Sequence, residues 1–240
     1  MTRGERVICV SATVREHVLA HWPRTDPNRL LVIERGIEPG RFTADFSQIA
    51  QWRQPLAEQF PALTSGPLLL LPGRGTRLKG HAEAIKLLAA LRARGTLACL
   101  WLLGAREPGR EAYVRELEAL AKKLHVAEYL VISAPESQMA RIYALAAVVL
   151  QLSNKPEAFG RTVLEALAAQ RPIVGWAHGG VGELLARYFP AGAVPKDDVE
   201  ALITTTLAAL ASPVSMHSSD LPSLSTMQAQ TLAAYDSLFG

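Results

Sequence analysis

The chain has 240 residues, of which 49% are apolar and 20% charged, so a packed core is expected and general disorder is excluded. The formal net charge of +3 comes from scattered cations. This charge is too weak to indicate nucleic-acid binding, but it suits contact with phosphates or an anionic membrane face. No apolar run reaches the roughly 18 residues that span a bilayer, and no signal peptide is recognisable. We therefore expect a cytoplasmic protein and leave open peripheral contact with the inner face of the membrane.

Short apolar runs alternate with amphipathic stretches along the chain. In chain order they predict a strand at 7–10, a helix at 14–21, strands at 30–33 and 68–71, a helix at 81–94, a strand at 97–103, a helix at 111–124, a strand at 129–132, a helix at 137–146, a strand at 148–152, a helix at 162–169, a strand at 173–176, and helices at 182–188, 199–210 and 227–238. Regular alternation of apolar strands and helices predicts an α/β fold. This is a Rossmann-like, doubly wound parallel sheet with helices on both faces. Such sheets bind ligands beyond the carboxyl ends of their strands.

Three further features can be interpreted from the sequence. Cys9 and Cys99 lie inside apolar strands and are expected to be buried thiols rather than a disulfide framework. The Ser- and Pro-rich stretch 212–225 is expected to be an exposed connection before the last helix. Asp197 and Asp198 precede a helix, so we expect capping from them rather than metal binding, and no metal site is predicted.

A glycine-rich loop with two cations follows the strand at 68–71. Gly73 lets the backbone approach a ligand, and the following helix offers free N–H groups. Arg74 can grip a phosphate with two N–H groups, while Lys79 supplies a point charge. Taken alone, the loop is equally compatible with a glycine turn and two solvated cations.

Two glutamates, Glu157 and Glu165, are eight residues apart, and one continuous helix would place them roughly 80° out of phase. Pro156 and Gly160 instead predict that Glu157 lies in a loop and that a helix begins near Arg161. Both carboxylates could then face one crevice, where they suit sugar and ribose hydroxyls because ionised carboxylates only accept hydrogen bonds. A solvated loop charge and a salt-bridge partner explain the same residues equally well.

The segment 154–167 resembles the paired-glutamate motif of the retaining glycosyltransferases of GT-B architecture, in family four, also called glycosyl transferases group 1. The residues that carry the resemblance are Glu157-Ala158-Phe159-Gly160, Glu165-Ala166, Pro172, Ile173-Val174, Gly179-Gly180, and Arg74 with Lys79-Gly80. The order of these motifs matches the family over nearly the whole chain. The chain departs from the family at Arg35-Gly36, at Gln170-Arg171 and at Val131-Ile132-Ser133.

The resemblance implies a hexosyltransferase-type enzyme whose donor is a UDP-, GDP- or ADP-sugar, with no cofactor and no metal. Arg74 and Lys79 would hold the diphosphate and stabilise the leaving group, Glu157 would contact the sugar, and Glu165 the ribose. Catalytic roles are thus expected for Arg74, Lys79 and Glu157. The expected donor-binding residues are Gly73, Arg74, Lys79, Ile132, Ser133, Glu157, Ala158, Phe159, Gly160, Arg161, Thr162 and Glu165, with Ile132 and Ser133 near the base.

The resemblance also implies that half of such an enzyme is absent from the 240 residues. Residues 1–34 would be the end of an N-terminal acceptor domain, and residues 35–240 the C-terminal nucleotide-sugar-binding domain with its C-terminal helix. We expect binding of the donor without transfer, for a glycan or lipid-linked acceptor in lipopolysaccharide or other envelope polysaccharide synthesis. The alternatives are a non-catalytic donor-binding subunit, a nucleotide-sugar epimerase of the same architecture and a plain Rossmann domain. His81 and His178 are the histidines expected near the site.

Overall fold

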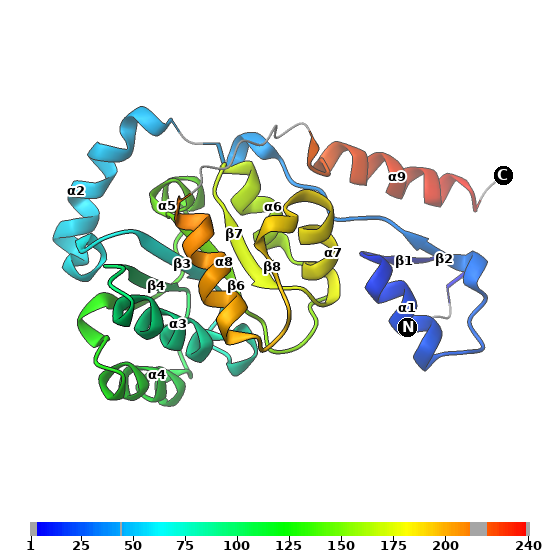
Figure 1. Ribbon diagram of the computed structural model, residues 1–240. Helices are drawn as coiled ribbons and strands as arrows, with labels where there is room; N and C mark the ends of the chain where they lie inside the picture. Colours follow the sequence, from blue (N-terminus) through cyan, green and yellow to red (C-terminus); the bar gives the residue numbers. More distant parts are fainter. Residues whose placement is uncertain (1–3, 44, 212–219, 239–240) are drawn as a thin grey trace.

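The computed structural model describes residues 4–43, 45–211 and 220–238, and its centre is a six-stranded sheet (Figure 1). All pairings in this sheet are parallel, in the order β5-β4-β3-β6-β7-β8. Its strands are β3 (Leu68–Pro72), β4 (Cys99–Leu103), β5 (Leu130–Ser133), β6 (Val148–Gln151), β7 (Ile173–Trp176) and β8 (Ala193–Val194). The helices around it are α2 (Ile49–Gln59), α3 (His81–Ala93), α4 (Glu111–Lys123), α5 (Met139–Leu145), α6 (Arg161–Ala168), α7 (Gly179–Tyr188) and α8 (Val199–Ala211).

Both faces of the sheet are covered, which explains why its strands are apolar without alternation. In β3, Leu69 and Leu71 pack with α3, α4 and α8, whereas Leu68 and Leu70 pack with α5, α6 and α7 on the opposite face. Figure 1 shows α8 and α3 lying across one face of the sheet. The predicted doubly wound α/β fold is therefore confirmed, and the carboxyl ends of β3 and β6 lie side by side because these strands are neighbours.

Most predicted elements are confirmed, with shifted ends. The predicted strand at 97–103 begins only at Cys99, because residues 96–98 form a turn in which Ala98 N–H donates to the Thr96 carbonyl and Leu97 is 61% exposed. The helix predicted from 182 begins at Gly179. Among the α-helices and strands of the described residues, two were not predicted: the helix α2, which contains Pro55, and the two-residue strand β8. Cys9 and Cys99 are buried free thiols, as predicted.

The N-terminal segment forms a separate two-stranded parallel sheet (Figure 1). It consists of β1 (Val7–Cys9), α1 (Ala12–His21) and β2 (Leu30–Val32). The start of α1 is tied to α7, because the Glu183 carboxylate accepts hydrogen bonds from the backbone N–H groups of Ala12 and Thr13. The Ser11 hydroxyl also donates to the Ala158 carbonyl at 2.6 Å. This segment is thus anchored directly on the loop that follows β6.

The connection predicted at 212–225 is only partly testable, because residues 212–219 lie outside the described residues. Within 220–225, Asp220 and Ser225 are exposed as expected, but residues 221–224 are not. Leu221 is buried, and the Leu224 N–H donates to the Ile37 carbonyl. Ser223 caps the last helix, α9 (Leu224–Asp236), by accepting a hydrogen bond from the Thr226 N–H. Backbone hydrogen bonds therefore hold the residues before α9 against the stretch around Ile37.

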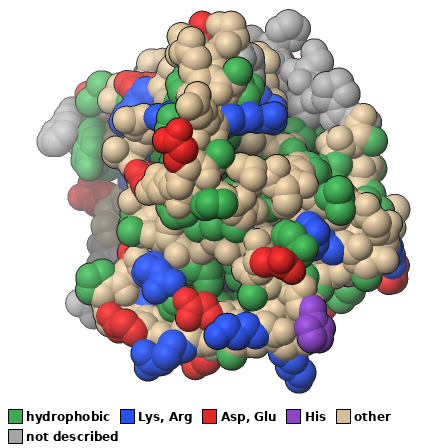
Figure 2. Space-filling model, turned by 90° about the vertical axis from the view of Figure 1, so that its left-hand side faces the viewer, with side chains coloured by type: hydrophobic (Ala, Val, Ile, Leu, Met, Phe, Trp, Pro, Cys, Tyr) green, Lys and Arg blue, Asp and Glu red, His purple; other side chains and the backbone are tan. Residues whose placement is uncertain are grey.

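Figure 2 shows the face turned toward the viewer from the left of Figure 1, where acidic and basic side chains are interspersed. Ion pairs that cross between elements include Arg77–Glu116 at 2.5 Å and Arg94–Glu200 at 2.8 Å. No helix among the described residues is long and apolar enough to cross a membrane.

Candidate functional site

The glycine-rich loop after β3 lies at the carboxyl end of the central strand. The Gly73 N–H donates to the Leu103 carbonyl, which joins the loop to the end of β4. Residues 77–79 form a single 3-10 turn, and α3 begins at His81 directly after it. Arg74 is exposed, whereas the Lys79 side chain is 26% exposed and points to the neighbouring loop after β6. The two predicted cations are thus on one loop but in different environments.

Gly80 allows this loop to lie against the loop after β6. Its φ is +72°, a left-handed conformation that L side chains rarely adopt, and a Cβ atom would lie 1.9 Å from the Leu152 carbonyl oxygen. Asn154 joins the same two loops, because its backbone N–H donates to the Leu78 carbonyl and its side-chain amide donates to the Arg77 carbonyl, both at 2.8 Å. The close approach therefore has a fixed register.

The approach of the two loops brings Lys79 and Glu157 together. Their side chains form an ion pair with a 2.5 Å distance between Nζ and Oε1, and the Ser153 hydroxyl donates to the same carboxylate. Burial raises the pKa of Glu157, but the hydrogen bonds from Lys79 and Ser153 and the lysine charge outweigh burial and hold that pKa below its usual value. The geometry therefore places an ionised carboxylate beside a cation, 78 residues apart in sequence.

Glu165 lies in the second turn of α6, as predicted, and lines a cavity of about 600 Å³. One carboxylate oxygen accepts a hydrogen bond from Arg161 at 2.8 Å, and the other accepts one from the Tyr143 hydroxyl at 2.8 Å. Arg161 lines the same cavity, together with residues of the N-terminal segment and of α9. The cavity thus lies between the six-stranded sheet's domain and the segment at its edge.

Gly160 immediately precedes α6 and has a φ of +103°. It packs closely on Val181, so a Cβ atom at position 160 would lie 2.8 Å from Val181 Cγ2. Phe159 is buried in the core, so only its backbone could contact a ligand. The Ala158 carbonyl is occupied by Ser11, as described above. Thr162 is partly buried in the first turn of the helix. The Val163 N–H donates to the Gly160 carbonyl, and the first turn of a helix is in general a place where backbone N–H groups can bind an anion.

Ile132 and Ser133, predicted to lie near a base, do not line the 600 Å³ cavity. The Ser133 hydroxyl accepts a hydrogen bond from the Trp101 indole at 2.8 Å and donates to the Ala134 carbonyl. Ser137 and Met139, a few residues further along, do line the cavity and were not predicted. Their position after β5 was the available signal, because ligands bind beyond the carboxyl ends of parallel strands.

The two histidines expected near the site contact the loops that follow β3 and β6. His178 lies just before α7, and its Nε2 is 2.9 Å from the Ser153 carbonyl. His81 is fully buried beneath the glycine-rich loop, with its Nδ1 3.3 Å from the Tyr113 hydroxyl. Direct phosphate contact by the His81 ring is therefore not possible in this arrangement.

The burial of His81 leads to a prediction about acid stability. Burial lowers the pKa of His81 from 6.5 to about 4, and the nearby backbone of Thr76 and Gly73 opposes this only partly. Between pH 6.5 and 4, the His81 ring is therefore protonated in the unfolded chain but neutral in the folded protein. The contribution of His81 to the free energy of unfolding is fully present above pH 6.5. This contribution should fall by about 3 kcal/mol between pH 6.5 and 4.

Urea denaturation as a function of pH measures this dependence, and an NMR titration of the His81 ring measures its pKa directly. A His81→Gln variant should lose much of the slope between pH 6.5 and 4. His17→Gln, which changes an exposed histidine on α1, should keep it. A His81 ring that titrates near its ordinary value in the folded protein would contradict the prediction.

Comparisons with known proteins bear on this site. Residues 53–219 match the protein family described as "Glycosyl transferases group 1". This range contains the glycine-rich loop, both glutamates and the Gly179-Gly180 pair at the start of α7. The D-inositol 3-phosphate glycosyltransferase of Xylanimonas cellulosilytica is 31% identical over 184 residues. These residues are 74% of this chain but only 43% of that protein, so the chain spans less than half the length of this curated relative.

Two solved structures share the fold. HepE from Anabaena in complex with UDP-glucose is 20% identical, with 98% of this chain and 65% of that chain covered and a TM-score of 0.79. WaaG, described as a glycosyltransferase involved in lipopolysaccharide biosynthesis, is 24% identical, with 86% of this chain and 54% of that chain covered and a TM-score of 0.67. The predicted half of a GT-B architecture is thereby confirmed at the level of the fold.

Proposed function

Because this chain belongs to the glycosyl transferases group 1 family, we propose that it is the donor-binding half of a retaining hexosyltransferase that uses a nucleoside diphosphate sugar. The observation that carries the proposal is the pairing of Lys79 with Glu157, at 2.5 Å, on two loops at the carboxyl ends of β3 and β6. Glu165 lines the 600 Å³ cavity, whereas Lys79 and Glu157 are not among the residues that line it. A cation for phosphate and two acceptors for hydroxyls therefore lie along one edge of the sheet.

Each residue in this proposal has a distinct chemical role. Lys79 and Arg74 bind the diphosphate and stabilise the charge that develops on it as the leaving group departs. The first turn of α6 adds backbone N–H groups near Gly160, Arg161 and Thr162, which favour an anion. Gly73 permits close approach of the phosphate, while the backbone of Ala158 and Phe159 borders the sugar.

The carboxylates recognise the hydroxyl groups of the donor. Glu157 accepts hydrogen bonds from the transferred sugar and Glu165 from the ribose. We propose that Ser137 and Met139 contact the base in addition to Ile132 and Ser133, because Ser137 and Met139 line the cavity. HepE was solved with UDP-glucose, which supports a UDP-sugar among the UDP-, GDP- and ADP-sugar donors considered.

The domain boundary is part of the same proposal. Residues 1–34 would belong to an acceptor domain and residues 35–240 to the donor domain. Support comes from the separate sheet of β1 and β2, and from the chain covering only 43% of its relative. On this proposal the 240 residues bind the donor but do not transfer sugar alone. Efficient transfer by the purified chain to a glycan or lipid acceptor would contradict this.

For the biological role, we propose synthesis of lipopolysaccharide or another envelope polysaccharide at the cytoplasmic side of the membrane. WaaG, which is similar in fold, is described with lipopolysaccharide biosynthesis. The net charge of +3 is compatible with transient contact with an anionic bilayer. A non-catalytic subunit that supplies the donor site to a separate acceptor protein would use the same residues.

Calorimetric titration with UDP, GDP, ADP and their glucose or mannose derivatives tests the proposed function. One nucleotide series should bind, and Glu165→Ala should weaken it roughly 10- to 150-fold, because a hydrogen bond to a charged group contributes about 1.5–3 kcal/mol. Glu118→Ala removes an exposed carboxylate on α4 that is paired with Arg106, and it should bind like the wild type. Failure of all three series to bind, or equal affinities for wild type and Glu165→Ala, would refute the donor-site proposal.

A further inference from the structure

Glu165 is held by two partners of very different character. Its carboxylate is 2.8 Å from Arg161 through one oxygen and 2.8 Å from the Tyr143 hydroxyl through the other. The Arg161 side chain is 60% exposed, and it lies one helical turn before Glu165 on the same helix. An exposed ion pair of this kind contributes little free energy and can be exchanged for a ligand. Arg161 therefore does not fix the carboxylate.

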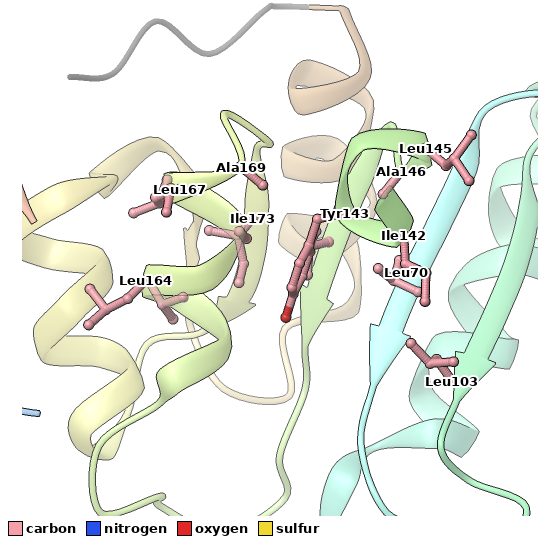
Figure 3. Close-up of a cluster of buried hydrophobic side chains, with 14 of the residues drawn as sticks. Leu70, Leu103, Ile142, Tyr143, Leu145, Ala146, Leu164, Leu167, Ala169 and Ile173 are labelled. Atoms are coloured by element: carbon pink, nitrogen blue, oxygen red, sulfur yellow. The ribbon is translucent and has the colours of Figure 1, made fainter. Parts of the chain in front are cut away.

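Tyr143, by contrast, belongs to the core. Its side chain is fully buried, and its ring makes an edge contact with Phe42 at 6.1 Å between centroids. Figure 3 shows the ring inside the hydrophobic cluster, near Ile142 and Ile173, with only its hydroxyl oxygen at the margin. A buried ring in a packed core has one rotamer available. The phenol oxygen therefore occupies a fixed point in space.

The phenol is also a permanent donor. Burial and the neighbouring Glu165 carboxylate raise the pKa of Tyr143 well above its usual value, so the hydroxyl is protonated at neutral pH. A protonated phenol beside a carboxylate donates its hydrogen to that carboxylate. One oxygen of Glu165 is therefore directed toward the core, while the other is directed toward Arg161 at the cavity.

We propose that Tyr143 is a positioning residue that orients the Glu165 carboxylate for recognition of the donor's ribose. This inference rests on the proposed function and adds a residue that does not itself line the cavity. Two neighbouring ribose hydroxyls can bind one carboxylate only if its plane is set correctly. A donor fixed in the core sets that plane before the ligand arrives, so less ordering is needed on binding.

The test compares ribose recognition in wild type and Tyr143→Phe, using UDP, GDP and ADP and the 2′,3′-dideoxy form of each. For the nucleotide that binds, removing both hydroxyls should weaken wild-type binding roughly 10- to 30-fold. In Tyr143→Phe this ratio should fall to roughly threefold or less, because only the ribonucleotide loses affinity. Tyr113→Phe is the matched control: it removes a buried phenol on the opposite face of the sheet, and it should keep the wild-type ratio.

A second readout needs no ligand. In a crystal structure of Tyr143→Phe, the Glu165 carboxylate should leave its wild-type position, while the fold and the neighbouring core stay unchanged. An unmoved carboxylate, or an unchanged ribose ratio, would overturn the role of Tyr143 even if nucleotides bind. Absence of binding by the wild type to all three nucleotides would instead refute the proposed function and, with it, ribose recognition. The two failures are therefore distinguishable.

Discussion

Replacing Gly80 with alanine is expected to destabilise the protein by about 4 kcal/mol or more, which is exceptional for one methyl group. The new Cβ atom would lie 1.9 Å from the Leu152 carbonyl oxygen, which belongs to the backbone, so no flexible side chain can give way. The left-handed φ of +72° adds strain. The loop after β3 would have to separate from the loop after β6, and the Lys79–Glu157 pair would be lost with it.

Gly95→Ala separates these two costs. Gly95 has a similar φ of +86°, but no atom lies within 4 Å of a Cβ placed there. It should therefore show only the left-handed strain, about 1–2 kcal/mol. Urea denaturation of both variants measures the difference. Equal destabilisation by the two substitutions would show that the contact between the loops is not the reason for glycine at position 80.

The fold was predictable because its signal is local. The four consecutive leucines of β3 and the apolar spacing of α3 indicate buried strands and helices without reference to the rest of the chain. The helix α2 was missed because Pro55 interrupts its pattern and Gln48 gives it no side-chain cap. In the structure it is held by partly buried apolar residues such as Trp52 that pack on the core. Tertiary packing outweighs the local signal there.

The candidate site was predictable only in part, because its geometry is not local. The sequence indicated a phosphate loop and two glutamates, but spacing could not show that Lys79 and Glu157 are ion-paired or that Ser153 donates to the same carboxylate. Tyr143 was expected only as one residue of an apolar helix. Its contact with Glu165 depends on how α5 packs beside α6, which no periodicity encodes.

The second large effect concerns Lys79. Lys79→Ala should weaken binding of the nucleoside diphosphate about 100-fold, because it removes a charge-assisted hydrogen bond and also leaves Glu157 ionised without its partner. The remaining carboxylate would then repel the diphosphate. Arg77→Ala is the matched control, since it removes a cation two residues away that is bound to Glu116 on α4, and it should change the affinity less than threefold.

The double variant Lys79→Ala/Glu157→Gln decides whether repulsion contributes. If Glu157 repels phosphate once Lys79 is gone, the double variant should bind the nucleoside diphosphate more tightly than Lys79→Ala alone. Glu157→Gln alone should not weaken binding of the sugar-free diphosphate, because it releases Lys79 for phosphate, but it should remove the additional affinity of the sugar-bearing donor. Equal affinities of the single and double variants would show that Lys79 acts only by attraction. The Lys79–Glu157 pair would then be a resting contact in the unliganded site, and phosphate and sugar recognition would be independent of each other.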